Sequence, residues 1–283
     1  MLIKKAYFIS ISSDIAGYIA GKLQKKGVIV HGTYRTKNES TKLLQENGAV
    51  LRKLDCNSKD EIKNFLSSDF SLQTWDLLMI SPATMKPIAR FDKCDWDEWE
   101  ASFKLNCLRQ FQLIHGLINY RNKSATIDPT LFMWSGPGTN NAPLNYSSEI
   151  TAKIAQIKMC ELLDAEFDNL KSIIAGPGWV NTKAHNETLE AGKSAGSNYL
   201  RTKEIIQSDQ VTSLEKIYEF LLWSLNQPKS IISGRNFSIR GDIWGNEELS
   251  KHLQTEINAF KLRRYSNDWR SFPKPKSELF SPK

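Results

Sequence analysis

Cysteine is scarce in this sequence, and its spacing excludes a disulfide scaffold and a zinc-binding site. The chain has four cysteines in 283 residues, with no CxxC pair and no histidine partner at metal-ligand spacing. Isolated thiols of this kind are typical of the reducing cytoplasm, where we expect the protein to lie, and no metal ion is expected. The four residues are Cys56, Cys94, Cys107 and Cys160.

The sequence also lacks long apolar runs. No run reaches the roughly 20 residues that a membrane-spanning helix needs. Asp14 interrupts the apolar N-terminal stretch and no small-residue cleavage site follows, which predicts a first strand and not a signal peptide. Hydrophobic residues still make up 40% of the chain, enough for a substantial buried core. We therefore expect a globular protein with no membrane partner.

The net charge of +7 is spread over the chain and is not tied to a nucleic-acid motif. The 38 basic residues are scattered among 31 acidic ones, and no zinc-finger, RNP or helix-turn-helix pattern is present, so no nucleic-acid partner is expected. The basic tail is predicted either to be solvated or to attract a phosphorylated ligand. Its residues are Lys261, Arg263, Arg264, Arg270, Lys274, Lys276 and Lys283.

Short apolar runs alternate with longer amphipathic ones, which is the pattern of βαβ units around a parallel sheet. It predicts an α/β fold, a Rossmann-type doubly wound and mostly parallel seven-stranded sheet flanked by helices. Residues 1–245 are predicted to form this domain, and residues 246–283 a C-terminal helix and basic tail. A polar stretch covers 181–208. The expected strands are 6–9, 28–30, 49–54, 77–80, 131–134, 172–175 and 236–239, and the expected helices 16–25, 39–47, 60–66, 97–120, 148–167 and 214–226.

Small residues fill the turn between the first strand and the first helix. Such turns let backbone N–H groups and a helix N-terminus approach a pyrophosphate. The turn resembles the TGxxxGIG phosphate loop of the short-chain dehydrogenases/reductases, although its three glycine positions hold Ser10, Asp14 and Ala16. The alternative is a degenerate loop with no ligand. The resemblance implies that the cofactor contacts here are Ser10, Ser12, Ser13, Asp14 and Ile15.

The next strand ends add further cofactor candidates. The second strand ends in Arg35, with no acidic residue where an NAD-specific enzyme would hold the ribose 2′-hydroxyl, so the resemblance implies NADP, with NAD possible. Asp55 resembles the aspartate that meets the adenine amino group. Ser81, Pro82 and Ala83 stand where the family has its NNAG turn.

The segment from residue 174 to 182 is the most specific single motif. It reads Ile-Ala-Gly-Pro-Gly-Trp-Val-Asn-Thr and matches the family's PG-x-V-x-T pattern. The resemblance implies that the backbone of Val180 and the hydroxyl of Thr182 hold the nicotinamide carboxamide, next to Pro177 and Gly178.

The catalytic region is altered. In the family a serine precedes a YxxxK motif, and an asparagine in the preceding long helix distorts the helix and holds a proton-relay water. Asn106 and Lys153 are correctly placed, but Glu149 stands at the tyrosine position. Ser135 is the serine candidate, with Gly136 at the usual position. The resemblance covers roughly residues 5–240 and implies catalytic roles for Asn106, Ser135, Glu149 and Lys153, with Lys153 also a cofactor contact.

A glutamate changes the chemistry of such a site. We expect Glu149 to be ionised, because its reference pKa is about 4.3 and the nearby Lys153 cation lowers it further. A carboxylate is a poor proton donor to an alkoxide. Three outcomes are open: Tyr146 supplies its hydroxyl instead, Glu149 acts as a base in a reaction such as epimerisation or dehydration, or the site binds nucleotide without turnover.

The resemblance extends to the branch linked to sugar-nucleotide and surface-polysaccharide synthesis. Arg263, Arg264, Lys183 and His185 could meet a diphosphate or simply form a surface cluster. The predicted function is that of an NAD(P)-dependent oxidoreductase acting on a sugar or nucleotide sugar. The alternative is a catalytically silent or non-redox nucleotide-binding relative, so whether the chain is an enzyme stays open.

A homodimer or homotetramer is also expected. The family commonly pairs the helices that correspond to 97–120 and 148–167 between subunits. A monomer in sedimentation at micromolar concentration would contradict this expectation.

Overall fold

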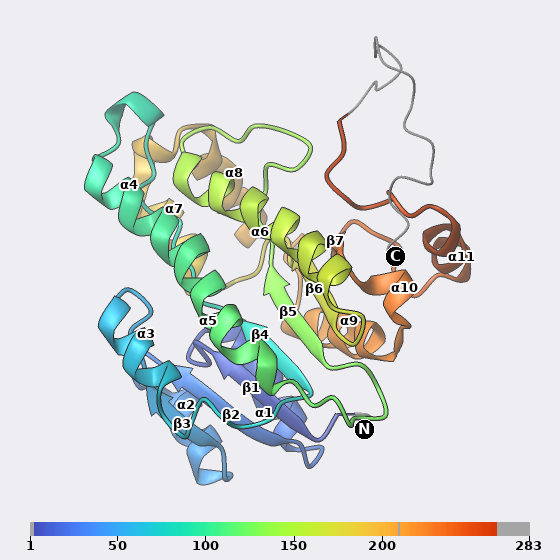
Figure 1. The fold of residues 1–283 in the computed structure, drawn as a ribbon. Helices are drawn as coiled ribbons and strands as arrows, with labels where there is room; N and C mark the ends of the chain where they lie inside the picture. The colour runs from blue at the N-terminus through green and yellow to red at the C-terminus, as the bar shows by residue number, and fades with distance from the viewer. Residues whose placement is uncertain (1–2, 209, 265–283) are drawn as a thin grey trace.

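A seven-stranded parallel sheet with helices on both faces forms the protein (Figure 1). The structure is a computed structural model that describes residues 3–208 and 210–264. The predicted Rossmann-type fold is confirmed, and the sheet is entirely parallel, in the order β3-β2-β1-β4-β5-β6-β7. The strands are β1 Lys5–Ile9, β2 Ile29–Tyr34, β3 Val50–Lys53, β4 Leu77–Ile80, β5 Thr130–Trp134, β6 Lys171–Gly176 and β7 Arg235–Ser238.

Each face of the sheet carries its own apolar core, because successive residues of a strand point to opposite sides. In β1, Phe8 packs in one core and Tyr7 in the other. The helices α1 (Asp14–Gln24), α2 (Glu39–Glu46) and α9 (Leu214–Asn226) contribute to the first core, and α3 (Lys59–Leu66), α5 (Arg109–Leu117) and α6 (Ser147–Glu166) to the second. Burial on both faces explains why β4 and residues 131–134 of β5 are continuous apolar runs.

The long helix expected at 97–120 is interrupted in its middle. It consists of α4 (Trp96–Phe103), the π-helical turn η2 (Lys104–Leu108), α5 and the short 3-10 turn η3 (Ile118–Tyr120). Asn106 lies in the π turn. Its side-chain oxygen accepts from the Thr84 N–H at 3.1 Å and its amide donates to the Thr84 carbonyl at 2.8 Å, which ties this turn to the loop after β4.

The polar stretch 181–208 contains two helices that the apolar pattern does not reveal. They are α7 (Lys183–Ala191) and α8 (Ser197–Ile206), joined by the 3-10 turn η4 (Gly192–Ala195). Buried positions on these helices include Thr188 and Thr202. Because threonines take some of the inward positions, beside Ile205 on α8, the apolar periodicity that normally reveals a helix is weak here.

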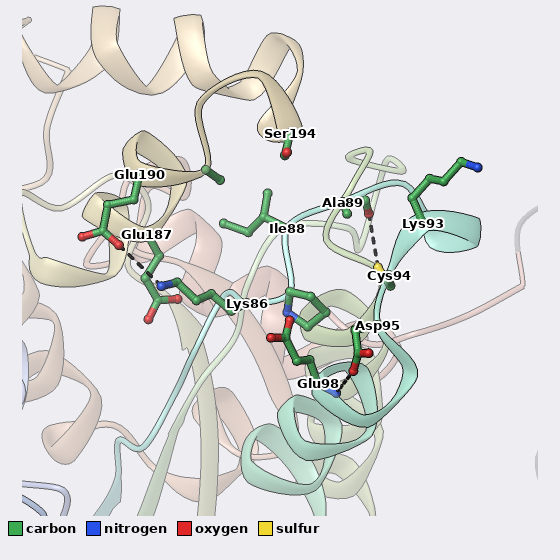
Figure 2. Close-up of a pocket in the computed structure, with 12 residues that line it drawn as sticks. Lys86, Ile88, Ala89, Lys93, Cys94, Asp95, Glu98, Glu187, Glu190 and Ser194 are labelled. Atoms are coloured by element: carbon green, nitrogen blue, oxygen red, sulfur yellow. Dashed lines mark hydrogen bonds and ion pairs between the residues drawn. The ribbon is translucent and has the colours of Figure 1, made fainter.

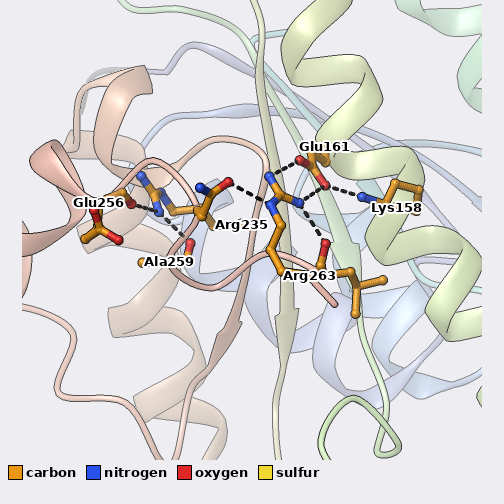
Figure 3. Close-up of polar contacts among 8 residues, drawn as sticks. Lys158, Glu161, Arg235, Glu256, Ala259 and Arg263 are labelled. Carbon is orange, nitrogen blue, oxygen red and sulfur yellow. Dashed lines mark hydrogen bonds and ion pairs between the residues drawn. The ribbon is translucent and has the colours of Figure 1, made fainter. Parts of the chain in front are cut away.

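Two arginines hold the C-terminal segment against the sheet and against α6 (Figure 3). Arg235 of β7 donates to the carbonyls of Leu253, Glu256 and Ala259, at 2.6, 3.1 and 2.5 Å. Arg263 forms an ion pair with Glu161 at 2.6 Å. The elements not yet named are η1 Phe91–Lys93, α10 Lys229–Ile232 and α11 Glu247–Thr255. Four residues of the predicted basic tail lie outside the described residues: Arg270, Lys274, Lys276 and Lys283.

Two further observations bear on partners. In residues 3–208 and 210–264, none of the helices has the length and apolar character needed to cross a membrane. In the same part of the chain, no cluster of three or more His, Cys, Asp or Glu side chains is arranged to hold a metal ion.

Candidate functional site

A cavity of about 1140 Å³ opens at the carboxyl ends of the central strands. It includes the point between β1 and β4 where the strand order reverses, which is where open α/β sheets bind their ligands. All of the predicted site residues except Asn106 line this one cavity. They are Ser10, Ser12, Ser13, Asp14, Ile15, Arg35, Asp55, Ser81, Pro82, Ala83, Ser135, Glu149, Lys153, Pro177, Gly178, Val180 and Thr182.

The loop after β1 keeps the shape of a tight turn without glycine. Ser10 has φ of 66°, in the left-handed region that favours glycine. The Ser13 N–H donates to the Ser10 carbonyl at 3.2 Å, and the Ser13 hydroxyl accepts from the Ala16 N–H at 3.3 Å, which caps α1. Asn38 donates to the Ser12 carbonyl at 2.9 Å and fixes the loop from the side. The turn is therefore built to point the start of α1 into the cavity.

Asp14 places a carboxylate at the first residue of α1, in the cavity wall. A helix N-terminus attracts anions, but here part of that attraction already acts on the protein's own carboxylate. A dinucleotide pyrophosphate at this end of the cavity would be repelled by it.

We predict that Asp14→Asn tightens the binding of NADPH. Removing one like charge near a pyrophosphate relieves roughly 1 kcal/mol at an exposed site, or about fivefold in affinity. Calorimetric titration of wild type and variant measures the change, with Glu39→Gln on α2 as the charge-matched control. Unchanged or weaker binding in Asp14→Asn would place the pyrophosphate elsewhere.

The cavity rim beside the loop after β1, at the end of β2, is basic. Arg35 and Lys37 are exposed there. The carboxylate of Asp55, the predicted adenine contact, accepts from the backbone and side-chain N–H groups of Asn57 at 2.9 and 3.1 Å. One Asp55 oxygen is thus engaged within the loop.

Glu149 and Lys153 form the buried centre of the cavity. They lie one turn apart on α6 and are only 6% and 5% exposed. Glu149 Oε2 has no hydrogen-bond partner among the described residues. A Cβ built on Gly136 would lie 2.5 Å from Glu149 Oε1 and 3.1 Å from Lys153 Cγ. The Glu149 carboxylate therefore fills the space that a side chain at 136 would need.

Burial raises the pKa of Glu149 above its ordinary value, and the Lys153 charge offsets this only in part. The expectation that Lys153 lowers the pKa of Glu149 below its ordinary value is therefore wrong. The reason is that the Lys153 ammonium is directed elsewhere: it donates to the Trp134 carbonyl at 2.8 Å and lies 3.5 Å from Gln156 Oε1. Burial also lowers the pKa of Lys153.

Ser135 and Gly136 point in different directions, as consecutive residues at the end of a strand do. The Ser135 hydroxyl lies 3.1 Å from the position of a Cβ on Gly176, at the end of β6. The position that faces Glu149 and Lys153 is Gly136, so no serine hydroxyl occupies it. A residue that the sequence did not single out, Trp134, donates its indole N–H to the Ser81 hydroxyl at 3.0 Å and lines the cavity.

Tyr146 is held by the helix opposite. Its hydroxyl donates to Thr188 of α7 at 3.0 Å, and its side chain is buried in a small cluster with Ile88 and Ala195. Burial raises the pKa of Tyr146. These contacts favour the reading of Tyr146 as a buried aromatic near the start of α6.

Asn106 lies behind the cavity wall. Its side chain is bound to the backbone of Thr84, and its carbonyl accepts from the Gln156 amide. Gln156 also donates to Gln110 at 2.8 Å, and Gln110 to the Pro82 carbonyl at 2.6 Å. Asn106 therefore supports the loop after β4, and a water on its carbonyl would have to compete with Gln156.

His185 is hydrogen-bonded to the Val180 backbone, which was expected to hold the nicotinamide carboxamide. The Val180 N–H donates to His185 Nε2 at 3.2 Å, and the His185 ring stacks on Trp179 with centroids 4.9 Å apart. Burial lowers the pKa of His185, which favours the neutral ring that this contact requires. His185 and Arg263 are therefore both engaged by protein groups, Arg264 is exposed, and the Lys183 side chain lies outside the described part.

A second, smaller cavity of about 390 Å³ lies between α7 and the segment from Lys86 to Glu98 (Figure 2). Glu187 lines both cavities, and its carboxylate accepts from the Met85 N–H at 2.7 Å and the Thr84 hydroxyl at 3.1 Å. Lys86 pairs with Glu190 at 3.5 Å. These contacts join α7 to the loop after β4 and so close the main cavity on that side.

Solved structures share this fold closely, although the sequences have diverged. The structure superposes on a short-chain dehydrogenase/reductase of Saccharomyces cerevisiae with a TM-score of 0.70 and 16% identity, covering 88% of this chain and 98% of that one. This chain has the fold of the short-chain dehydrogenases/reductases. The sequence itself matches no protein-family model and no curated protein.

Two other solved structures carry the same fold. One is the ligand-free aldohexose dehydrogenase of Thermoplasma acidophilum, with a TM-score of 0.68 and 16% identity over 83% of this chain and 92% of that one. The other is the actinorhodin polyketide ketoreductase with NADPH, with a TM-score of 0.68 and 16% identity over 84% and 96%. At this level of identity the similarity concerns the fold alone.

Proposed function

We propose that this protein is an NAD(P)-dependent oxidoreductase that interconverts a carbonyl and a hydroxyl group, with Glu149 as the proton donor or acceptor. The observation that carries the proposal is the buried Glu149 carboxyl, with one oxygen unpartnered, beside Lys153 in the main cavity. A bound nicotinamide would supply or accept the hydride. Glu149 would give its proton to the carbonyl oxygen, so that hydride and proton together make the alcohol.

The raised pKa of Glu149 supports an acid role. A carboxylic acid kept neutral by burial can donate a proton that an ionised carboxylate cannot. Lys153 would then stabilise the carboxylate that remains after proton transfer. Because the acid form is required, the rate of reduction is expected to fall as pH rises through the pKa of Glu149.

The cavity fits a nicotinamide dinucleotide in several respects. Its volume of about 1140 Å³ leaves room for a ligand of this kind, and the left-handed turn at Ser10 brings the start of α1 to the cavity wall. The ketoreductase that shares the fold was solved with NADPH, which adds support. Against the fit stand Asp14 and the His185 contact to Val180, which a bound cofactor would have to tolerate or displace.

NADP is the preferred cofactor in this proposal. Arg35 lies on the cavity rim at the end of β2, where a 2′-phosphate would meet it. We predict that Arg35→Ala weakens NADPH binding by roughly tenfold or more and leaves NADH binding nearly unchanged, since a hydrogen bond to a charged group contributes about 1.5–3 kcal/mol. Calorimetry with both cofactors measures this, with the exposed Arg52→Ala on β3 as control. Equal affinity of wild type for both cofactors would contradict the assignment.

A sugar or nucleotide sugar is the proposed substrate class. The polar loop Thr139-Asn140-Asn141 lines the cavity and offers amide and hydroxyl groups to sugar hydroxyls. An aldohexose dehydrogenase shares the fold, which is consistent with this class. Oxidation of NADPH with a panel of aldoses, nucleotide sugars and simple ketones tests it. Turnover of simple ketones alone would contradict it.

The contact between His185 and the Val180 N–H favours a second candidate, a relative that binds a nucleotide and does not turn over. In that case NADPH binds, but no compound of the panel accelerates its oxidation. Binding with turnover excludes this candidate.

A further inference from the structure

The main cavity continues along α6 beyond its acid centre. Glu149, Lys153 and Ile157 line it at intervals of four residues, so they lie on one face of successive turns. From Glu149 to Ile157 this face extends roughly 12 Å at the rise of an α-helix. We refer to the part beyond Lys153 as the distal arm.

The C-terminal segment forms the other wall of the distal arm. Phe260, Lys261 and Leu262 line the cavity there. Asn236 of β7 fixes this wall, because its N–H donates to the Phe260 carbonyl at 2.8 Å and its side-chain amide lies 3.3 Å from the Thr139 hydroxyl. Asn236 thus connects the C-terminal segment to the loop after β5.

Lys261 brings an unpaired positive charge to this wall. The side chain is half-buried, and in residues 3–208 and 210–264 its ammonium has neither a hydrogen-bond partner nor an ion pair within 4 Å. The two carboxylates that act on it are already engaged. Asp164 pairs with Lys229 at 2.5 Å, and Glu161 pairs with Arg263 at 2.6 Å.

The charges around Lys261 leave the distal arm positive. Burial is the largest effect and lowers the pKa of Lys261; Asp164 and Glu161 oppose the shift, and Arg235 and Arg263 add to it. A half-buried cation without a counter-charge costs free energy, and a bound anion would recover part of it. Asn236 Oδ1, buried without a partner, would accept from a neighbouring ligand hydroxyl.

We propose that Lys261 is a specificity-determining residue that binds an anionic group of the substrate, a carboxylate or a phosphate, in the distal arm while the reacting carbonyl lies at Glu149. This inference rests on the proposed oxidoreductase function. The substrate class that follows is an acidic or phosphorylated carbonyl compound that also carries hydroxyl groups. Arg263, the tail residue considered earlier for a diphosphate, is instead paired with Glu161 and holds this wall in place.

Three aldehydes on one scaffold test the inference: benzaldehyde, 4-carboxybenzaldehyde and 4-formylphenyl phosphate. With NADPH and the full-length protein, kcat/KM is expected to be at least tenfold higher for a charged aldehyde than for benzaldehyde. Whichever charged aldehyde is favoured identifies the anion as carboxylate or phosphate. Lys261→Met should remove the preference without changing the rate on benzaldehyde, and Lys261→Arg should keep it. Lys158→Met is the matched control, because Lys158 also lies beside Glu161 and loses one positive charge, but it does not line the cavity.

Calorimetric binding of terephthalate and phenyl phosphate to the same variants separates this inference from the proposed function. If Lys261→Met binds these two anions at least tenfold more weakly than the wild type, and no aldehyde is turned over, the result would support the anion site and count against the oxidoreductase function. Turnover with no preference for a charged aldehyde, or a preference that survives in Lys261→Met, would overturn the inference and leave the oxidoreductase standing.

Discussion

Glu149→Gln is expected to lower the rate of carbonyl reduction by roughly 10²–10⁴-fold while leaving NADPH affinity unchanged. Glutamine keeps the shape of the side chain but has no acidic proton. General acid catalysis contributes roughly 10²–10⁴-fold to the rate. Single-turnover rates of NADPH oxidation with a reactive aldehyde measure the loss, and calorimetry measures the affinity. Glu166→Gln, an exposed position on the same helix, is the control. Equal rates in wild type and Glu149→Gln would remove Glu149 from the mechanism.

The same substitution should also stabilise the protein at alkaline pH. The folded pKa of Glu149 is raised, so between the unfolded value of about 4.3 and the folded value the native state binds more protons than the unfolded state. The free energy of unfolding of the wild type therefore falls as pH rises through this window. The Glu149→Gln variant lacks this titration. Denaturant unfolding at several pH values should therefore show the free energies of unfolding of the two proteins diverging as pH rises through this window.

Gly136→Ala is expected to displace the acid. A methyl group at this position would lie 2.5 Å from Glu149 Oε1 inside a buried site, so the carboxyl or the strand end must move. Overpacking of this kind costs roughly 1–3 kcal/mol of stability, and the misplaced acid should lower kcat by about tenfold or more. Denaturant unfolding and steady-state kinetics measure the two effects.

The control for this prediction is Gly21→Ala in α1, where the nearest atom would be 3.9 Å from the new methyl group. It should be neutral or slightly stabilising. In Gly136→Ala combined with Glu149→Gln, the loss in kcat should be much smaller than the product of the two single losses, because both changes remove the same proton donor. Multiplicative losses would show that Gly136 acts independently of Glu149.

The sheet could be predicted from the sequence because its strands are buried on both faces. The runs at 77–80 and 131–134 are apolar throughout, as is typical of strands between two helical layers. The residues at the strand ends were assigned to the cofactor site by the resemblance to the family, and they meet because parallel strands present their carboxyl ends at one edge. The shared cavity is a consequence of topology and not of any single motif.

Two features could not be predicted in this way, and a third was missed although the sequence contained its signal. The helices α7 and α8 bury threonines, so they carry little apolar periodicity. The raised pKa of Glu149 comes from its burial, which the Lys153 charge offsets only in part while the ammonium donates to the Trp134 carbonyl; the spacing of the two residues on α6 determines neither feature. The opposite directions of Ser135 and Gly136 follow from the twofold alternation of a strand, a signal that the sequence did contain.

The transfer of deuterium from [4,4-²H₂]NADPH, labelled on both faces of the nicotinamide ring, to a carbonyl substrate tests the central claim most directly. With wild-type protein and a panel of charged and uncharged carbonyl compounds, including sugars, mass spectrometry should find one deuterium on the carbinol carbon of at least one product. The label should appear at least a hundredfold more slowly with Glu149→Gln. If NADPH binds but no product carries deuterium, or if Glu149→Gln transfers it as fast as wild type, the account of this cavity as a reductase site with Glu149 as its acid is wrong.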